Sequence, residues 1–158
     1  MIFVTLGSQK FQFNRLLKEL DRLLEEKLID EEIFAQIGAS DYKPHNYEYK
    51  EFIDRDEFKK MMDKADIVIA HGGTGAIITA VKKEKKVIAI PRLAKYEEHV
   101  DDHQIQLVDE FKELNLIYPV YDEKNLEKAI KEIRKKKYNK YISNTQTIIE
   151  DIESFIEE

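Results

Sequence analysis

The sequence of 158 residues contains no cysteine. This absence excludes a disulfide framework, thiol catalysis and cysteine-based metal sites, and it agrees with a reducing compartment. The sequence also lacks a long apolar run. Ile2–Leu6 follows Met1 directly, without a basic segment, and is too short for the core of a signal peptide or for a membrane span. We therefore expect a cytoplasmic protein with no export signal and no membrane-spanning segment.

Two common phosphate-binding motifs are missing. No G-x-G-x-x-G sequence follows the first apolar run, where Gly7 stands alone, and this disfavours NAD and FAD. The Walker pattern G-x-x-x-x-G-K-[ST] is absent as well. His99 and His103 lie one helical turn apart but lack the glutamate and third ligand of a zinc hydrolase, so we expect no metal and no other cofactor. His71, beside a glycine pair, either reaches a phosphate or orients the turn.

The composition is that of a folded, acidic protein. Hydrophobic residues make up 42% of the chain and charged residues 37%, which suits a soluble globular domain rather than a disordered segment. A formal charge of −6 provides no general attraction to nucleic acid, so we expect no such partner. The basic runs Lys82–Lys86 and Arg134–Lys137 are interpreted as solvated helix ends, with contact to lipid head groups or an acidic partner as the alternative.

Short apolar segments alternate with longer segments of helical periodicity. The expected strands are Ile2–Leu6, Ile33–Ile37, Tyr47–Phe52, Ile67–Ala70, Val87–Ile90 and Ile117–Val120. Apolar residues at helical spacing predict helices within Phe13–Leu28, Phe58–Met62, Ile77–Val81, Ile105–Phe111 and Leu126–Ile133. Because parallel strands need crossover connections that are usually helical, the alternation predicts an α/β fold, a Rossmann-like, doubly wound, mostly parallel sheet of six strands.

The final segment, about residues 141–157, is predicted to be an amphipathic helix. Its apolar face contains Tyr141, Thr145, Ile148, Ile149, Ile152, Phe155 and Ile156. Such a helix either packs on its own sheet or docks on a second chain. The length of the chain and the absence of a linker or repeat predict a single domain over residues 1–158.

Two glycine turns are expected to meet at one edge of this sheet. The fourth strand is followed by the turn His71–Gly75 and a helix, and the first strand is followed by Gly7 and Ser8. Glycine lets a ligand approach the backbone, and a helix N-terminus favours an anion. In the common strand order 3-2-1-4-5-6, strands one and four are neighbours and ligands bind where their turns open. We predict a nucleotide or its diphosphate there, with ordinary glycine-dependent turns as the alternative.

The loop after the fifth strand starts at the same sheet edge and is rich in polar side chains. Its last residues, Asp102, His103 and Gln104, enter a predicted helix and offer donors and acceptors to a hydroxyl-rich ligand. Arg92 or Lys95, nearer the start of the loop, would lie close to the diphosphate. The alternative is that the acidic residues of the loop only cap the helix.

The motifs FVTLGSQ, HGGTGAIITAV, VIAIPR and EEHVDDHQ occur in this order. With them, the chain resembles the C-terminal, donor-binding domain of GT-B glycosyltransferases of family 28, the family that includes the lipid II synthase of peptidoglycan assembly. It is most similar to small stand-alone members, which are soluble subunits of two-component transferases. These are the eukaryotic subunit for the second GlcNAc of dolichol-linked oligosaccharide and the bacterial capsule or exopolysaccharide subunits described as β-1,4-galactosyltransferase or its enhancer. The resemblance covers Ile2 to about Leu114 and implies half of a GT-B fold.

This resemblance implies a UDP-sugar site without a metal. The diphosphate would be held by Gly7, Ser8 and the turn His71, Gly72, Gly73, Thr74 and Gly75, with Arg92 nearby. His103 and Gln104 would face the sugar hydroxyls, and Phe52 and Ile53 would lie near uracil. Such enzymes invert the anomeric centre, and the helix N-terminus and basic groups stabilise the departing UDP.

Two features depart from the pattern of the relatives: the residue at position 79, and the absence of their usual Gly-x-Pro sequence near Glu84–Lys86. They usually carry a glutamate at the position of Thr79, where it holds the ribose hydroxyls. A threonine hydroxyl cannot bind two hydroxyls as a carboxylate does. This departure favours a weakened or regulatory subunit.

A GT-B enzyme closes two such domains around donor and acceptor, and this chain has room for one. The resemblance therefore implies a membrane-anchored partner of the N-terminal GT-B type. That partner would bind a lipid-linked sugar acceptor, supply the catalytic base and recruit the chain to the inner face of the plasma membrane. The predicted C-terminal helix is the candidate interface.

Three hypotheses for function follow. In the first, the chain is the UDP-sugar-binding subunit of a two-component inverting hexosyltransferase of the UDP-Gal or UDP-GlcNAc type. It would extend a polyprenyl-diphosphate-linked sugar in capsule or exopolysaccharide synthesis, and it would be active only with its partner. In the second, it is a non-catalytic enhancer that stabilises or activates the partner. In the third, it is an unrelated Rossmann-like nucleotide enzyme such as a sugar-nucleotide epimerase domain.

Overall fold

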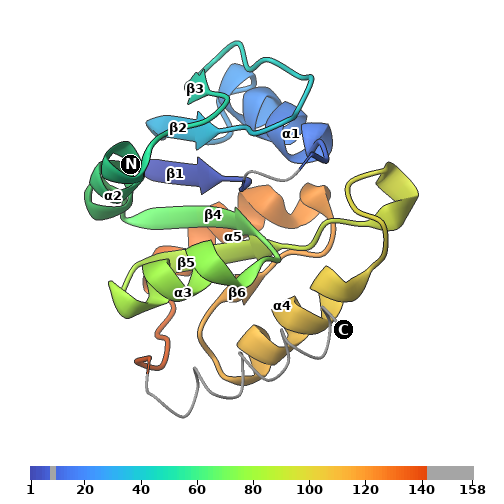
Figure 1. Cartoon of the computed structure of the whole chain (residues 1–158). Coiled ribbons are helices and arrows are strands. Elements are labelled where there is room, and N and C mark those ends of the chain that lie inside the picture. Colours follow the sequence, from blue (N-terminus) through green and yellow to red (C-terminus); the bar gives the residue numbers. More distant parts are fainter. Residues whose placement is uncertain (8–9, 142–158) are drawn as a thin grey trace.

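Six parallel strands form one sheet in the order β3-β2-β1-β4-β5-β6 (Figure 1). The computed structural model describes residues 1–7 and 10–141. The strands are β1 Ile2–Thr5, β2 Ile33–Gln36, β3 Glu48–Lys50, β4 Ile67–His71, β5 Lys86–Ile90 and β6 Tyr118–Pro119. This topology confirms the predicted doubly wound α/β sheet, in which β1 and β4 are neighbours although they are far apart in the sequence.

Helices connect the strands and cover both faces of the sheet. They are α1 Asn14–Glu25, α2 Arg55–Lys64, α3 Thr74–Lys82, α4 His103–Glu113 and α5 Leu126–Glu132, with 3₁₀ turns at Ala94–Tyr96, Glu123–Asn125 and Ile133–Lys135. No helix within residues 1–7 and 10–141 is long and apolar enough to cross a bilayer. Ser8 and, apart from Tyr141, the predicted C-terminal helix lie outside the described residues.

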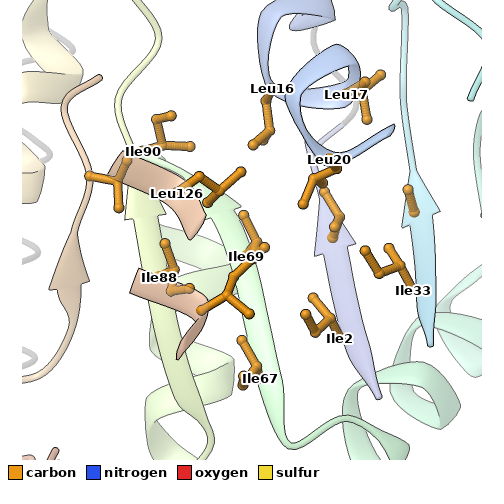
Figure 2. Packing of buried hydrophobic residues seen from close by; sticks show 14 of the residues in the cluster. Ile2, Leu16, Leu17, Leu20, Ile33, Ile67, Ile69, Ile88, Ile90 and Leu126 are labelled. Atoms are coloured by element: carbon orange, nitrogen blue, oxygen red, sulfur yellow. The ribbon is translucent and has the colours of Figure 1, made fainter. Parts of the chain in front are cut away.

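Alternating side chains of each strand build two cores. In β4, Ile67 and Ile69 contact the cluster beneath α1 and α5, whereas Val68 and Ala70 contact the cluster beneath α2, α3 and α4. Figure 2 shows the first cluster, where isoleucines of β1, β4 and β5 meet leucines of α1 and Leu126 of α5. Because both faces are covered, the strands are buried along nearly continuous apolar runs.

Asn14 is the first residue of α1, and the residue before the helix, Phe13, makes no side-chain cap hydrogen bond. The side chain of Gln12 instead accepts a hydrogen bond from the Asn14 N–H at 2.8 Å, and Asn14 Oδ1 accepts from the Tyr42 N–H at 3.0 Å. Asn14 therefore ties α1 to the loop after β2.

Leu20 of α1 has no exposed surface and lies in the core cluster of Figure 2. Replacing Leu20 by alanine is expected to lower the free energy of unfolding by about 3 kcal/mol, because the change removes buried apolar surface and leaves a cavity. Urea unfolding measures the effect. Leu24→Ala is the matched control on the same helix; its side chain is only partly buried, so its loss should be clearly smaller. Equal losses for the two variants would contradict this packing.

Candidate functional site

A cavity of about 530 Å³ opens at the carboxyl edge of the sheet. Three of its residues, Thr5, Gln36 and His71, are the last residues of β1, β2 and β4. The other lining residues come from the adjoining turns and from the starts of α2 and α3: Gly7, Phe52, Ile53, Asp54, Arg55, Phe58, Gly73, Thr74, Gly75 and Ala76. Its size is in the range of small-molecule sites, and its place is the crevice where open α/β sheets bind ligands.

The two glycine turns meet inside this cavity. Gly7 has φ +72°, a left-handed conformation that favours glycine, and its carbonyl accepts a hydrogen bond from Gln36 Nε2 at 2.8 Å. A Cβ on Gly7 would stand 2.9 Å from His71 Nε2. The turns that follow β1 and β4 can therefore lie in close contact because Gly7 has no side chain.

The start of α3 presents free backbone donors to the cavity. Gly73 precedes the helix, and no side chain among the described residues caps it. The first N–H groups of a helix have no partner within the helix, so those of Thr74, Gly75 and Ala76, which line the cavity, are available. A Cβ on Gly75 would meet no atom within 4 Å. The turn is thus open on the side from which an anion would approach.

Behind the turn, His71 is buried and held by hydrogen bonds. Its Nδ1 accepts from the Gly73 N–H at 3.1 Å and lies 3.2 Å from Gln104 Nε2. The pKa of His71 is lowered to about 3, chiefly by burial and in the same direction by the positive charge of Arg92, while the hydrogen bond to Gln104 opposes the shift. The imidazole is therefore neutral at physiological pH.

A family model described as "glycosyltransferase family 28 C-terminal domain" matches residues 1–158. The chain belongs to this family. Comparison with curated protein sequences finds no match.

Solved structures support the fold of this family 28 domain. A crystal structure of MurG from Acinetobacter baumannii superposes with a TM-score of 0.57 and 16% identity, over 96% of this chain and 49% of that one. The glycotransferase of kitacinnamycin gives a TM-score of 0.61 and 14% identity, over 98% and 38%. The solution structure of ALG13 gives 0.59 and 17%, over 92% and 91%.

The family 28 domain thus spans less than half of the first two proteins and nearly all of ALG13. At these identities the similarity concerns the fold. It identifies the sheet and its helices as one half of a GT-B arrangement.

Arg92 of the family 28 domain does not lie where the sequence suggested. It is 1% exposed and does not line the cavity. Its guanidinium donates hydrogen bonds to four main-chain carbonyls, those of Leu6 at 2.6 Å, Phe11 at 3.1 Å, Gln12 at 3.2 Å and Glu98 at 3.4 Å. These bonds hold the guanidinium on the β1–α1 loop, and the predicted contact of Arg92 with a diphosphate finds no support in the lining of the cavity.

His103 and Gln104 also lie outside the cavity lining. The Gln104 side chain is buried and bonded on both its oxygen and its nitrogen, so it is not free to face sugar hydroxyls. His103 is exposed, and its Nδ1 lies 3.2 Å from Asp101 Oδ2. Asp101 Oδ1 accepts from the His103 N–H at 3.1 Å, whereas Asp102, the residue before α4, makes no side-chain cap hydrogen bond.

Thr79 is on α3 but does not line the cavity. Its hydroxyl donates to the Gly75 carbonyl at 2.9 Å, one helical turn back. Phe52 and Ile53, by contrast, line the cavity together with the glycine turns. Their contact with a uracil ring stays a prediction.

Thr5, Gln36 and Arg55 are among the cavity residues that were not predicted from the sequence. Gln36 Oε1 accepts from the Thr5 hydroxyl at 3.0 Å, so both polar side chains are fixed across two strand ends. Thr5 and Gln36 are polar residues within otherwise apolar strands, and this pattern could have identified them as candidate site residues. Arg55, the first residue of α2, lines the cavity and makes no hydrogen bond or ion pair within the described part of the chain.

Proposed function

We propose that this family 28 domain is the donor-binding subunit of a two-component inverting glycosyltransferase. The observation that carries the proposal is the uncapped start of α3, which opens into a cavity where the Gly7 and Gly73 turns meet. A helix N-terminus free of side-chain caps favours a diphosphate. Coverage of less than half of MurG, against 91% of ALG13, suits a chain that supplies one half of the enzyme.

The lining of the cavity contains both apolar side chains and polar groups, which would suit the two parts of UDP. Phe52, which is 57% exposed, Ile53 and Phe58 offer apolar surface for a uracil ring. The turn after β4 would hold the diphosphate. Arg55 would supply the positive charge that Arg92, turned to the main chain, does not.

The chemistry proposed is transfer of a hexose from UDP-Gal or UDP-GlcNAc with inversion. Negative charge develops on the departing UDP, and the N–H groups at the start of α3 and the neutral imidazole of His71 would stabilise it. A membrane-anchored partner of the N-terminal GT-B type would bind a polyprenyl-diphosphate-linked sugar and supply the base. Synthesis of capsule or exopolysaccharide is the proposed setting, on the resemblance of the HGGTG and DDHQ motifs.

Calorimetry tests this proposal. UDP, UDP-GlcNAc and UDP-Gal are titrated into the isolated chain and into its complex with the partner, and we expect binding of UDP and of one of the two sugar nucleotides. Absence of binding in both preparations would refute the donor-binding role. Transfer by the chain alone would point to an unrelated nucleotide enzyme instead.

A second candidate function is a non-catalytic enhancer of the partner. It is favoured by Thr79, whose hydroxyl is bonded to the Gly75 carbonyl and which does not line the cavity. The two roles differ in what the complex needs. An enhancer carrying a blocked cavity would still activate its partner fully, whereas a donor-binding subunit would not.

Gly75→Ala separates stability from binding. Gly75 lies in the first turn of α3, and an added methyl meets no atom within 4 Å, so alanine should raise the free energy of unfolding by about 0.5–1 kcal/mol by restricting the unfolded chain. The same methyl stands at the cavity wall and is expected to weaken UDP binding by about tenfold, a loss near 1.4 kcal/mol. Urea unfolding and calorimetry measure the two effects. Unchanged affinity in the stabilised variant would contradict a diphosphate on this turn.

A further inference from the structure

Gln104 links the ends of two strands to the start of α4. Its side chain is 5% exposed. Its Oε1 accepts hydrogen bonds from the Gly72 N–H and from the Arg92 N–H, each at 3.0 Å. Both partners are backbone donors, so the side-chain atom that faces them must be the oxygen. This requirement fixes which way the amide points.

The amide nitrogen of Gln104 therefore faces His71. It lies 3.2 Å from Nδ1, and the Gly73 N–H points at the same ring nitrogen from 3.1 Å. Two donors directed at one nitrogen require a lone pair there, so a neutral ring must carry its proton on Nε2. The charged group against the ring is Arg92, with His99 farther away, and burial together with Arg92 keeps the ring neutral.

The protonated nitrogen lies at the cavity wall. His71 is a lining residue, and a Cβ on Gly7 would stand 2.9 Å from Nε2. Nε2 makes no hydrogen bond to any residue that the structure describes. The ring thus offers one donor beside the Gly7 turn, and Gln104 lies on its opposite side.

We propose that Gln104 is a positioning residue of the donor site: its amide fixes the tautomer of His71 and the backbone of the turn after β4, and it makes no contact with the sugar. The inference rests on the proposed function for the identity of the ligand, a nucleoside diphosphate. Gln104 therefore affects how tightly the diphosphate binds, and it does not affect which sugar is preferred.

Gln104→Glu reverses the contact with His71 Nδ1 and keeps the two with the Gly72 and Arg92 N–H groups, while a proton on Nδ1 would also end the hydrogen bond that it accepts from the Gly73 N–H. A carboxylate still accepts from the Gly72 and Arg92 N–H groups, but it places an acceptor opposite His71 Nδ1. The ring proton is then expected to move to Nδ1, which turns Nε2 from a donor into an acceptor at the cavity wall. Gln106→Glu is the matched control, because it makes the same chemical change two residues along α4 on an exposed side chain.

Nitrogen-15 NMR of the histidine rings in the ligand-free chain reads the tautomer directly. In the wild type we expect a protonated Nε2 and an unprotonated Nδ1 for His71, unchanged from pH 5 to 8, and the same in Gln106→Glu. In Gln104→Glu we expect a protonated Nδ1. A wild-type ring protonated at Nδ1, or an unchanged ring in Gln104→Glu, would overturn the proposal.

Calorimetry then compares UDP with UDP-GlcNAc and UDP-Gal. Gln104→Glu is expected to weaken UDP and the bound sugar nucleotide by the same factor, about tenfold or more, since a charge-assisted hydrogen bond to phosphate is lost. A loss confined to the sugar nucleotide would make Gln104 a sugar ligand and overturn the proposal. If wild-type chain and complex bind no UDP, the proposed function fails, while the ring assignment still decides whether Gln104 positions His71.

Discussion

Gly73→Ala is expected to reduce the binding of UDP and UDP-sugars at least a hundredfold, a loss of about 3 kcal/mol or more. A Cβ on Gly73 would stand 2.4 Å from His71 Cε1, closer than atoms can approach, so the buried ring must move. That movement breaks the Gly73 N–H bond to Nδ1 and disturbs the contact of Gln104 with the ring. Calorimetry with UDP, on the chain and on its complex, measures the loss.

The backbone of Gly73 itself does not require glycine. Its φ of −81° and ψ of 158° are extended values that alanine adopts without strain. The cost to folding should therefore come only from repacking the ring, about 2 kcal/mol. Gly75→Ala is the control for this folding cost, because its methyl meets no atom within 4 Å. A Gly73→Ala chain that is folded and binds UDP with wild-type affinity would remove the turn from the ligand site.

Gly73→Ala can also be tested by measuring sugar transfer by the complex. If the chain is the donor-binding subunit, Gly73→Ala should abolish transfer while the partner still associates. If the chain is an enhancer, transfer should persist at the wild-type rate. This comparison therefore decides between the two functions with one substitution.

The topology could be predicted because it depends on patterns that are local in the sequence. Apolar runs separated by helical periodicity predicted all six strands, and the common doubly wound order 3-2-1-4-5-6 placed β1 beside β4. The crevice between the Gly7 and His71 turns followed from that order. Boundaries were less accurate at the edges of the sheet, where β3 contains three residues and β6 two.

The direction of polar side chains could not be predicted in the same way. Arg92 and Gln104 were assigned to the ligand because they are polar and lie near the carboxyl edge. The structure turns both toward main-chain groups that belong to distant segments: the Leu6 carbonyl for Arg92 and the Gly72 N–H for Gln104. Buried backbone groups need partners, and which side chain supplies them depends on contacts across the fold. The position of a polar residue in the sequence does not show which buried backbone groups it will bond.

Arg55 shows the converse error. It was not singled out, because a charged residue at the start of a helix is common on protein surfaces. Only the packing of α2 beside the carboxyl ends of β1 and β4 brings it to the cavity. A residue with no partner in the described part of the chain is free to bind a ligand, whereas both terminal nitrogens of Arg92 are bonded to main-chain carbonyls.

Arg92→Met is expected to lower the free energy of unfolding by about 4 kcal/mol and to abolish UDP binding. Methionine has similar length but no donors, so the buried carbonyl of Leu6 and the partly buried carbonyls of Phe11 and Gln12 lose their partner. Unpaired buried polar groups cost about 1–3 kcal/mol each. The β1–α1 loop, including Gly7, is then no longer held against the cavity. Urea unfolding and calorimetry record the two losses.

Arg92→Lys distinguishes this role from a phosphate ligand. An ammonium group retains the charge but cannot reach carbonyls on both sides of the loop as the planar guanidinium does. It should therefore be nearly as damaging as methionine. Arg55→Met is the crossed control: that side chain is exposed and unpartnered within the described residues, so its loss should weaken UDP binding and leave stability unchanged. If Arg92→Lys has wild-type stability and binds UDP normally, Arg92 acts through its charge and the proposed loop support is wrong. If Arg92→Lys loses stability and Arg55→Met loses only UDP binding, Arg92 supports the loop and Arg55 contacts the phosphate.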